Sequence, residues 1–586
     1  MKFFNKILLF AALITFGTAC ENFDLDLQEN PNAITPDKAD VDALYNGIQL
    51  GFRDVYTSSE YTPGAAARMY HAGSFTYNAL VAPATFNGLW NNAYARLFAD
   101  INTLKQITDA SGQTIHAGTA RIMEAYTLMV LADLFDSVPY SQGLQGIDVI
   151  SPAADSGAEI YAAAGKLLED AIANLSSVDN VTPPPSDLFY GDLATGDRVA
   201  AWISLANTLK LRAALNTRLI DPAASAAVFN GVLADGNFID GASEDFQFNY
   251  GNQRLNPNSR HWMYNNHYEL DDGDYLNNYY MWLLRADKLD ADGNAVIDPR
   301  IRYYFYRKVE DAAAQDPTTY SCHFSALPNK NDAGDFLSHW ENVDSRLPYC
   351  IVLAGDGYSG RDHLNGEGIP PDGFVRTSYG LYPGGGQFDD SSYANTQAAG
   401  ETGGRGEGIL PIMLSSFVDF MRAEAALTIG TGEDAAALLE SGIRASMAKT
   451  KSFESIVEST MSATRTDREG NSITIRELYS MTDEDVNDYV TYVLDAYNAA
   501  GSDAERLDIV IKEYYIAAWG NGKEAYNMYR RTGYPANMQP GLEPETGGFP
   551  YSMTLPTDYT TRNASAPQDR TIADRVFWDD GSADVY

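Results

Sequence analysis

The chain has 586 residues, of which 45% are hydrophobic, and this fraction is typical of a globular protein with a large core. Its formal net charge of −38 at pH 7 disfavours binding to nucleic acid or to anionic membrane surfaces, because phosphate groups repel an acidic protein. Neutral and cationic ligands remain compatible with this charge.

The N-terminal residues 1–19 are typical of a signal peptide. Lys2 and Lys6 provide positive charge, and the apolar run from Ile7 to Phe16 is too short to span a membrane. Cleavage before Cys20 would leave an N-terminal cysteine, where we expect lipidation and anchoring to a membrane. The alternative is an ordinary secreted protein that happens to have a cysteine here.

Helical spacing of apolar residues dominates the chain after a turn-rich linker at 30–37. The run from Arg121 to Phe135 has no polar face, so we expect a central helix buried on all sides, with an extended exit at Val138-Pro139. Further helices are expected over Asp40–Tyr56 and Leu89–Ile107.

Four helix pairs are predicted, each a longer helix followed by a shorter one that is often rich in Ala. Such pairs are typical of tetratricopeptide-like repeats, which bury their apolar stripes by stacking on their neighbours. The predicted pairs are Arg121–Phe135 with Ser156–Leu175, Asp197–Leu219 with Pro222–Ala234, Pro411–Ile429 with Glu433–Met447, and Ala504–Gly520 with Lys523–Arg531.

The sequence therefore predicts a mostly α-helical fold. Its helical scaffold spans 40–235 and 409–535, and a loop-rich insertion at 236–408 interrupts it. Residues 536–586 form an irregular tail. The insertion contains most of the Gly-Gly, Asp-Gly and Pro-Pro turns, and much of the Trp and Tyr. A rigid scaffold that displays long loops usually carries its binding residues there.

Motifs for common catalytic sites are missing, namely HExxH, GxSxG and the phosphate-binding GxxxxGK[ST]. The seven His residues have no metal-ligand spacing, and carboxylates are too numerous for a glycosidase pair to stand out. We therefore predict no catalytic residue, no metal and no cofactor. We interpret Gly403–Gly408 as a flexible lead-in to the helix at Pro411.

Two smaller features leave alternatives open. The segment from Asp290 to Asn294 is typical of a hairpin turn, while a calcium loop using Asp290 and Asp292 would lack suitable ligands at its first and last positions. A disulfide between Cys322 and Cys350 depends on geometry that spacing does not show.

Aromatic residues set among Asn, Asp and Gly are the strongest indication of ligand binding. Trp and Tyr rings stack on the C–H faces of sugars, and neighbours such as Asn265 and Asn266 hydrogen-bond hydroxyl groups. Peptide side chains fit the same surfaces, and packing within the loops is the structural alternative. The candidate ligand-binding residues are Trp262, Tyr264, Tyr268, Trp340, Tyr358 and Tyr382 in the insertion, with Tyr70 and Tyr77 in an earlier irregular stretch.

Four stretches carry a resemblance to a known family. They are TARIMEAYTLMVLADLFDSVPYSQ, YGDLATGDRVAAWISLANTLKLRAALN, IPPDGFVRTSYGLYPGGGQFD and IVIKEYYIAAWGNGKEAYNMYRRTGYP. They resemble the SusD/RagB-like nutrient-binding outer-membrane lipoproteins, in particular the branch called SusD-like 2. The likeness extends over nearly all of the mature chain.

This resemblance implies a single SusD-like domain over 20–586, held at the cell surface of the outer membrane by a lipid on Cys20. It implies capture of oligosaccharides, or of peptides in some members, and delivery to a partner, a SusC-like TonB-dependent barrel transporter. No catalysis is expected. The alternatives are a surface glycan hydrolase, and a structural lid or adhesin without a ligand of its own.

Overall fold

The computed structural model describes residues 40–177, 183–269, 274–311, 344, 346–347, 356–366, 375–394, 396, 400–466, 470–542 and 545–586. The signal peptide, Cys20, the linker at 30–37, Cys322, Trp340 and Cys350 lie outside the described residues.

Helix α7 (Thr114–Phe135) is the centre of the helical scaffold. All of its residues from Ile115 onward are buried except Arg121, which confirms the prediction of a helix buried on all sides. The helix ends at Asp136, whose backbone takes a φ of 65° that a right-handed helix does not allow. Helix α8 (Gly157–Leu175) follows and begins with a capping box.

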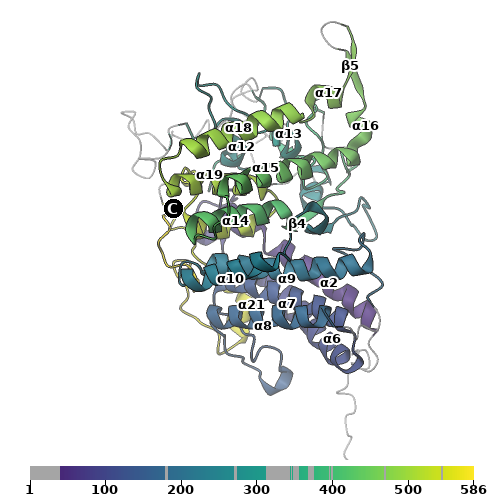
Figure 1. Ribbon diagram of the computed structural model, residues 1–586, viewed down its shortest axis with the longest axis vertical. Coiled ribbons are helices and arrows are strands. Elements are labelled where there is room, and N and C mark those ends of the chain that lie inside the picture. The colour runs from purple at the N-terminus through teal and green to yellow at the C-terminus, as the bar shows by residue number, and fades with distance from the viewer. Residues whose placement is uncertain are drawn as a thin grey trace, which may run out of the picture.

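The other long helices stack along the long axis of the molecule (Figure 1). They are α2 (Val41–Ser58), α6 (Phe98–Ser111), α9 (Thr195–Thr217), α10 (Pro222–Asp235), α14 (Ser415–Thr428), α15 (Ala435–Ser452), α18 (Asp483–Ala499) and α19 (Asp503–Ala517). Each helix contacts the next one in the order α6, α7, α8, α9, α14, α15 and α18. The pairs α7/α8, α9/α10 and α14/α15 pack on each other as expected, and the fold is mostly α-helical as predicted.

The fourth predicted pair is arranged differently. Helix α19 packs against α14, α15 and α18, whereas α20 (Gly522–Thr532) packs against the short helix α3 (Tyr61–Ala66). Helices α3 and α20 approach closely where Gly64 faces Gly522, since a Cβ on Gly522 would lie 2.6 Å from the Cα of Gly64. Glycine at both positions allows this crossing.

The predicted helix start at Pro411 is wrong. Residues Ile409–Met413 form strand β4, which pairs antiparallel with β1 (Phe246–Asn249), and α14 begins only at Ser415. All five residues of β4 are buried, and a short apolar run of this kind fits a buried strand as well as a buried helix. The segment Gly403–Gly408 therefore leads into a strand.

Short elements complete the fold. The strands are β2 (Phe305–Tyr306) with β3 (Ser378–Tyr379), and β5 (Thr464–Thr466) with β6 (Ser472–Thr474). The short helices are α4 (Tyr77–Leu80), α5 (Asn87–Trp90), α11 (Trp262–Tyr264), α12 (Asn278–Arg285), α13 (Ile301–Tyr304), α16 (Glu458–Met461), α17 (Ile475–Tyr479) and α21 (Thr557–Arg562). Two π-helical segments, η3 (Asn91–Leu97) and η6 (Asn265–Glu269), and the 3₁₀ turns η2 (Pro83–Phe86), η4 (Gly146–Asp148), η5 (Ala242–Glu244) and η10 (Phe453–Val457) are also present.

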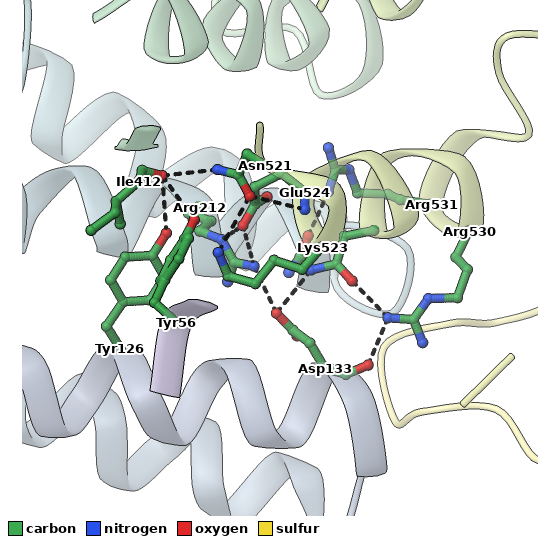
Figure 2. Close-up of polar contacts among 12 residues, drawn as sticks. Tyr56, Tyr126, Asp133, Arg212, Ile412, Asn521, Lys523, Glu524, Arg530 and Arg531 are labelled. Atoms are coloured by element: carbon green, nitrogen blue, oxygen red, sulfur yellow. Dashed lines mark hydrogen bonds and ion pairs between the residues drawn. The ribbon is translucent and has the colours of Figure 1, made fainter. Parts of the chain in front are cut away.

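A buried polar network joins α7, α9 and α20 (Figure 2). The Asp133 carboxylate of α7 accepts a hydrogen bond from Arg212 of α9 at 2.7 Å, and Arg212 also pairs with Glu524 of α20 at 2.6 Å. Arg530 of α20 donates to the backbone oxygen of Asp133 at 2.6 Å. Buried charges that satisfy one another fix the relative positions of the three helices. Within the described chain, no helix combines the length and apolar character needed to cross a bilayer.

Candidate ligand-binding site

Trp262 opens the short helix α11, immediately after His261. The His261 Nδ1 accepts a hydrogen bond from the backbone N–H of Met263 at 3.1 Å and so caps this helix. The indole lies edge-on to Tyr70 at 5.8 Å and to Tyr379 at 5.7 Å, measured between ring centroids. Trp262 remains half-buried, so its position is fixed by packing while part of its surface reaches solvent.

Tyr61 is a second half-buried ring beside it. It lies edge-on to Trp262 at 5.9 Å, stacks on the buried Tyr70 at 5.3 Å, and donates its hydroxyl to the backbone oxygen of His71 at 3.0 Å. We call Tyr61 and Trp262 the aromatic edge. Sequence reasoning missed Tyr61, although its surroundings in the irregular stretch from Thr57 to Gly88 marked the region.

A buried carboxyl group lies beneath the aromatic edge. The Tyr70 hydroxyl donates a hydrogen bond to Glu60. Burial raises the pKa of Glu60 to about 8, and the Tyr70 hydroxyl and the Lys523 ammonium oppose part of that rise. Glu60 is therefore largely protonated at neutral pH, and the aromatic edge rests on an uncharged support.

Tyr264 and Tyr268 pack inward. Their rings stack at 4.6 Å, and both residues are at most 1% exposed. The Tyr264 hydroxyl donates to the backbone oxygen of Thr402 at 2.8 Å, and the Tyr268 hydroxyl donates to that of Tyr379 at 2.6 Å. The two rings thus hold the glycine-rich loops of the insertion against the scaffold.

Tyr77, Tyr358 and Tyr382 are also buried, at separate places. The Tyr77 hydroxyl is hydrogen-bonded to His363 Nε2 at 2.9 Å. The Arg307 guanidinium lies 5.0 Å from the centroid of the Tyr358 ring, and Tyr382 stacks on Tyr304 at 5.5 Å.

The structure therefore gives packing roles to six of the predicted residues. It brings Trp262 to Tyr70 and Tyr264 to Tyr268, but it does not gather the set on one surface. The rings of these six residues are buried in this conformation. Tyrosine suits this role because its ring buries a large apolar area when loops pack on a scaffold. Ligand contact stays a prediction for Trp262, and for Trp340 outside the described residues.

The segment at Asp290 is the hairpin turn that its sequence favours. Leu289 and Ala295 form a bridge, and the Asp290 carboxylate accepts the backbone N–H groups of Asp292 at 2.9 Å and Asn294 at 2.7 Å. The carboxylate thus stabilises the turn. In the part of the chain that the structure describes, no group of three or more His, Cys, Asp or Glu is placed to hold a metal ion.

Comparison with known proteins places these features in a family. The SusD-like_2 family model, described as starch-binding and associating with the outer membrane, matches residues 37–356. The SusD-like family model, described as SusD and RagB outer membrane lipoprotein, matches residues 378–562. No curated protein matches the chain.

Solved structures share the fold. A chitin-binding SusD homologue from Flavobacterium johnsoniae is 16% identical with a TM-score of 0.59, and the match covers 93% of this chain and 99% of that one. A SusD homologue from Bacteroides uniformis ATCC 8492 is 18% identical with a TM-score of 0.58, and the match covers 92% and 99%. A SusD/RagB family protein from Bacteroides thetaiotaomicron VPI-5482 is 20% identical with a TM-score of 0.58, and the match again covers 92% and 99%.

Proposed function

Because this chain belongs to the SusD/RagB family of outer-membrane lipoproteins, we propose that it captures oligosaccharides at the cell surface and delivers them to a SusC-like TonB-dependent transporter. As a member of this family, the chain is an outer-membrane lipoprotein. The family's proteins bind without catalysis, so the chain is not an enzyme. A surface glycan hydrolase is the alternative, and release of shortened products from a glycan would identify it. The lipid anchor is assigned to Cys20 as part of the proposal.

The ligand class is inferred from relatives and from surface chemistry. Starch is named for one matching family and chitin for a structural relative, and both are uncharged or weakly charged glycans. The chain's net charge of −38 repels anionic polymers. These observations favour a neutral oligosaccharide, with a peptide as the second candidate.

The observation that carries the proposal is the aromatic edge. Tyr61 and Trp262 are half-buried residues, and Tyr70 and Tyr379 hold their rings in place. A ring that is already fixed loses little conformational entropy on binding, so it suits stacking on the C–H face of a sugar. No proton transfer or nucleophile is needed for such a role.

Isothermal titration of the purified protein with neutral oligosaccharides and with peptides tests the proposal. We expect saturable binding of an oligosaccharide, weakened about tenfold or more in Trp262→Ala because aromatic anchors dominate binding energy. Ile220→Ala is the matched control, since it removes an exposed apolar side chain between α9 and α10 and leaves the aromatic edge intact. Copurification with a barrel transporter but no binding of any ligand would instead support a structural lid.

A further inference from the structure

A cleft of about 560 Å³ lies at one end of the helical stack. Its lining residues include neither residue of the aromatic edge. It is formed by the segment 296–302, which leads into α13, by the end of α17, and by the first half of α18. Figure 1 shows these three helices at the same end of the long axis. Its volume is within the range of about 300–1,000 Å³ found for sites that hold small ligands.

The floor of the cleft is rigid. Tyr489 is buried there, and its hydroxyl donates to the Glu513 carboxylate at 2.9 Å. Arg300 behind it pairs with Asp298 at 2.6 Å and with Glu513 at 3.2 Å, and Lys288 pairs with Glu513 at 3.0 Å. These buried charges are paired with one another, and the pairing fixes the residues of the floor.

The walls expose apolar and aromatic surface. Ile297 is 43% exposed and Leu478 is 37% exposed. Tyr479 and Tyr492 are half-buried, and the Tyr492 hydroxyl is fixed by donating to the backbone oxygen of Leu289 at 3.0 Å. Aromatic and aliphatic faces held in this way suit the C–H faces of sugar rings.

Polar groups of both hydrogen-bonding kinds flank these faces. Arg302 lies 4.5 Å from the centroid of the Tyr479 ring and donates through Nη1 to the backbone oxygen of Asp389 at 2.7 Å and to Ser391 at 3.1 Å. Asp488 on α18 is exposed, and its carboxylate forms no hydrogen bond or ion pair with any described residue. A sugar hydroxyl both donates and accepts, so it matches a cleft lined by both a carboxylate and a guanidinium.

We propose that this cleft, the α18 cleft, is a second glycan-binding site that takes a short uncharged stretch of an oligosaccharide. The proposal rests on the function proposed above and adds a site that shares none of its residues. A cationic peptide would also be attracted by Asp488, but Arg302, which lines the same cleft, repels a positive charge. An anionic glycan is disfavoured by Asp488 and by Asp485 on the same helix.

The test is equilibrium titration of the full-length mature protein with neutral malto- and chito-oligosaccharides, in wild type and in single variants. Asp488→Ala and Tyr479→Ala should each weaken one of two binding events about tenfold, which corresponds to the loss of one good contact. Trp262→Ala should leave that event unchanged. Asp495→Ala is the matched control, because it removes the same charge from α18 outside the cleft lining.

Melting temperatures of the variants establish that they fold, and both substituted side chains are at least partly exposed. Isotherms of Asp488→Ala and Tyr479→Ala that coincide with wild type and Asp495→Ala would overturn the α18 cleft while leaving the aromatic edge in place. Absence of any saccharide binding in wild type would overturn the proposed function and this site together. Binding of a lysine-containing peptide, but of no saccharide, that depends on Asp488 would overturn the glycan assignment.

Discussion

Replacing Asp133 with alanine tests whether the buried network holds the helical scaffold together. Asp133 is 2% exposed and accepts hydrogen bonds from Arg212 at 2.7 Å, Asn527 at 3.0 Å, Tyr161 at 2.5 Å and Trp578 at 2.9 Å. Removing one partner of a buried ion pair destabilises a protein by about 3–5 kcal/mol. Three further donors lose their acceptor, so we expect the upper end of this range, about 5 kcal/mol.

The change is large enough to measure by calorimetry. With an unfolding entropy of about 2.1 cal mol⁻¹ K⁻¹ per residue, a chain of 586 residues gains about 1.2 kcal mol⁻¹ K⁻¹, and the melting temperature of Asp133→Ala should fall by about 4 °C. Asp170→Ala, which removes the exposed partner of Lys166 on α8, should change it by less than about 1 °C. Equal melting temperatures for the two variants would refute the structural role of the network.

Three further predictions concern the packing beneath the aromatic edge. The folded state keeps the Glu60 proton up to about pH 8, while the unfolded chain releases it near 4.5, so stability should fall as pH rises across this interval. Glu60→Gln should remove that slope in melts between pH 5 and 9, and an unchanged slope would contradict the assignment. Burial lowers the pKa of His71 from 6.5 to about 4. Between these pH values the unfolded chain binds a proton that the folded chain does not, so stability should fall as pH drops from 6.5 to 4. A melting temperature in His71→Gln that depends on acid as strongly as wild type would count against this. Gly522→Ala should lower the melting temperature by about 1–3 °C, since its Cβ would lie 2.6 Å from backbone atoms of Glu60 and Gly64, whereas Gly165→Ala, with open space around it, should not lower it.

Helices with a complete apolar pattern could be predicted because their burial does not depend on one partner. Apolar residues occur on every side of the stretch from Arg121 to Phe135, so a packed arrangement buries it, and the structure shows this in α7 for every residue but Arg121. The prediction that consecutive helices form repeat-like pairs also placed α8 against α7, and the structure confirms it. The strand at Ile409–Met413 was missed because a run of five buried residues has no period that separates strand from helix.

The site was harder to predict because burial of a ring depends on contacts far apart in sequence. Trp262 and Tyr264 are two positions apart on α11, yet the first is only half-buried and the second is fully buried against Tyr268. Composition identifies both as candidates and cannot tell them apart. The α18 cleft was missed for the same reason, since Arg302 and Tyr479 meet only in the folded protein.

The central claim is that this protein holds an oligosaccharide without changing it. Equilibrium dialysis of the purified protein against a labelled neutral oligosaccharide, followed by chromatography of the recovered ligand, tests both parts together. The account predicts saturable retention on the protein side and recovery of the ligand at its original length. Either no retention at saturating concentration or the appearance of shorter products would contradict it.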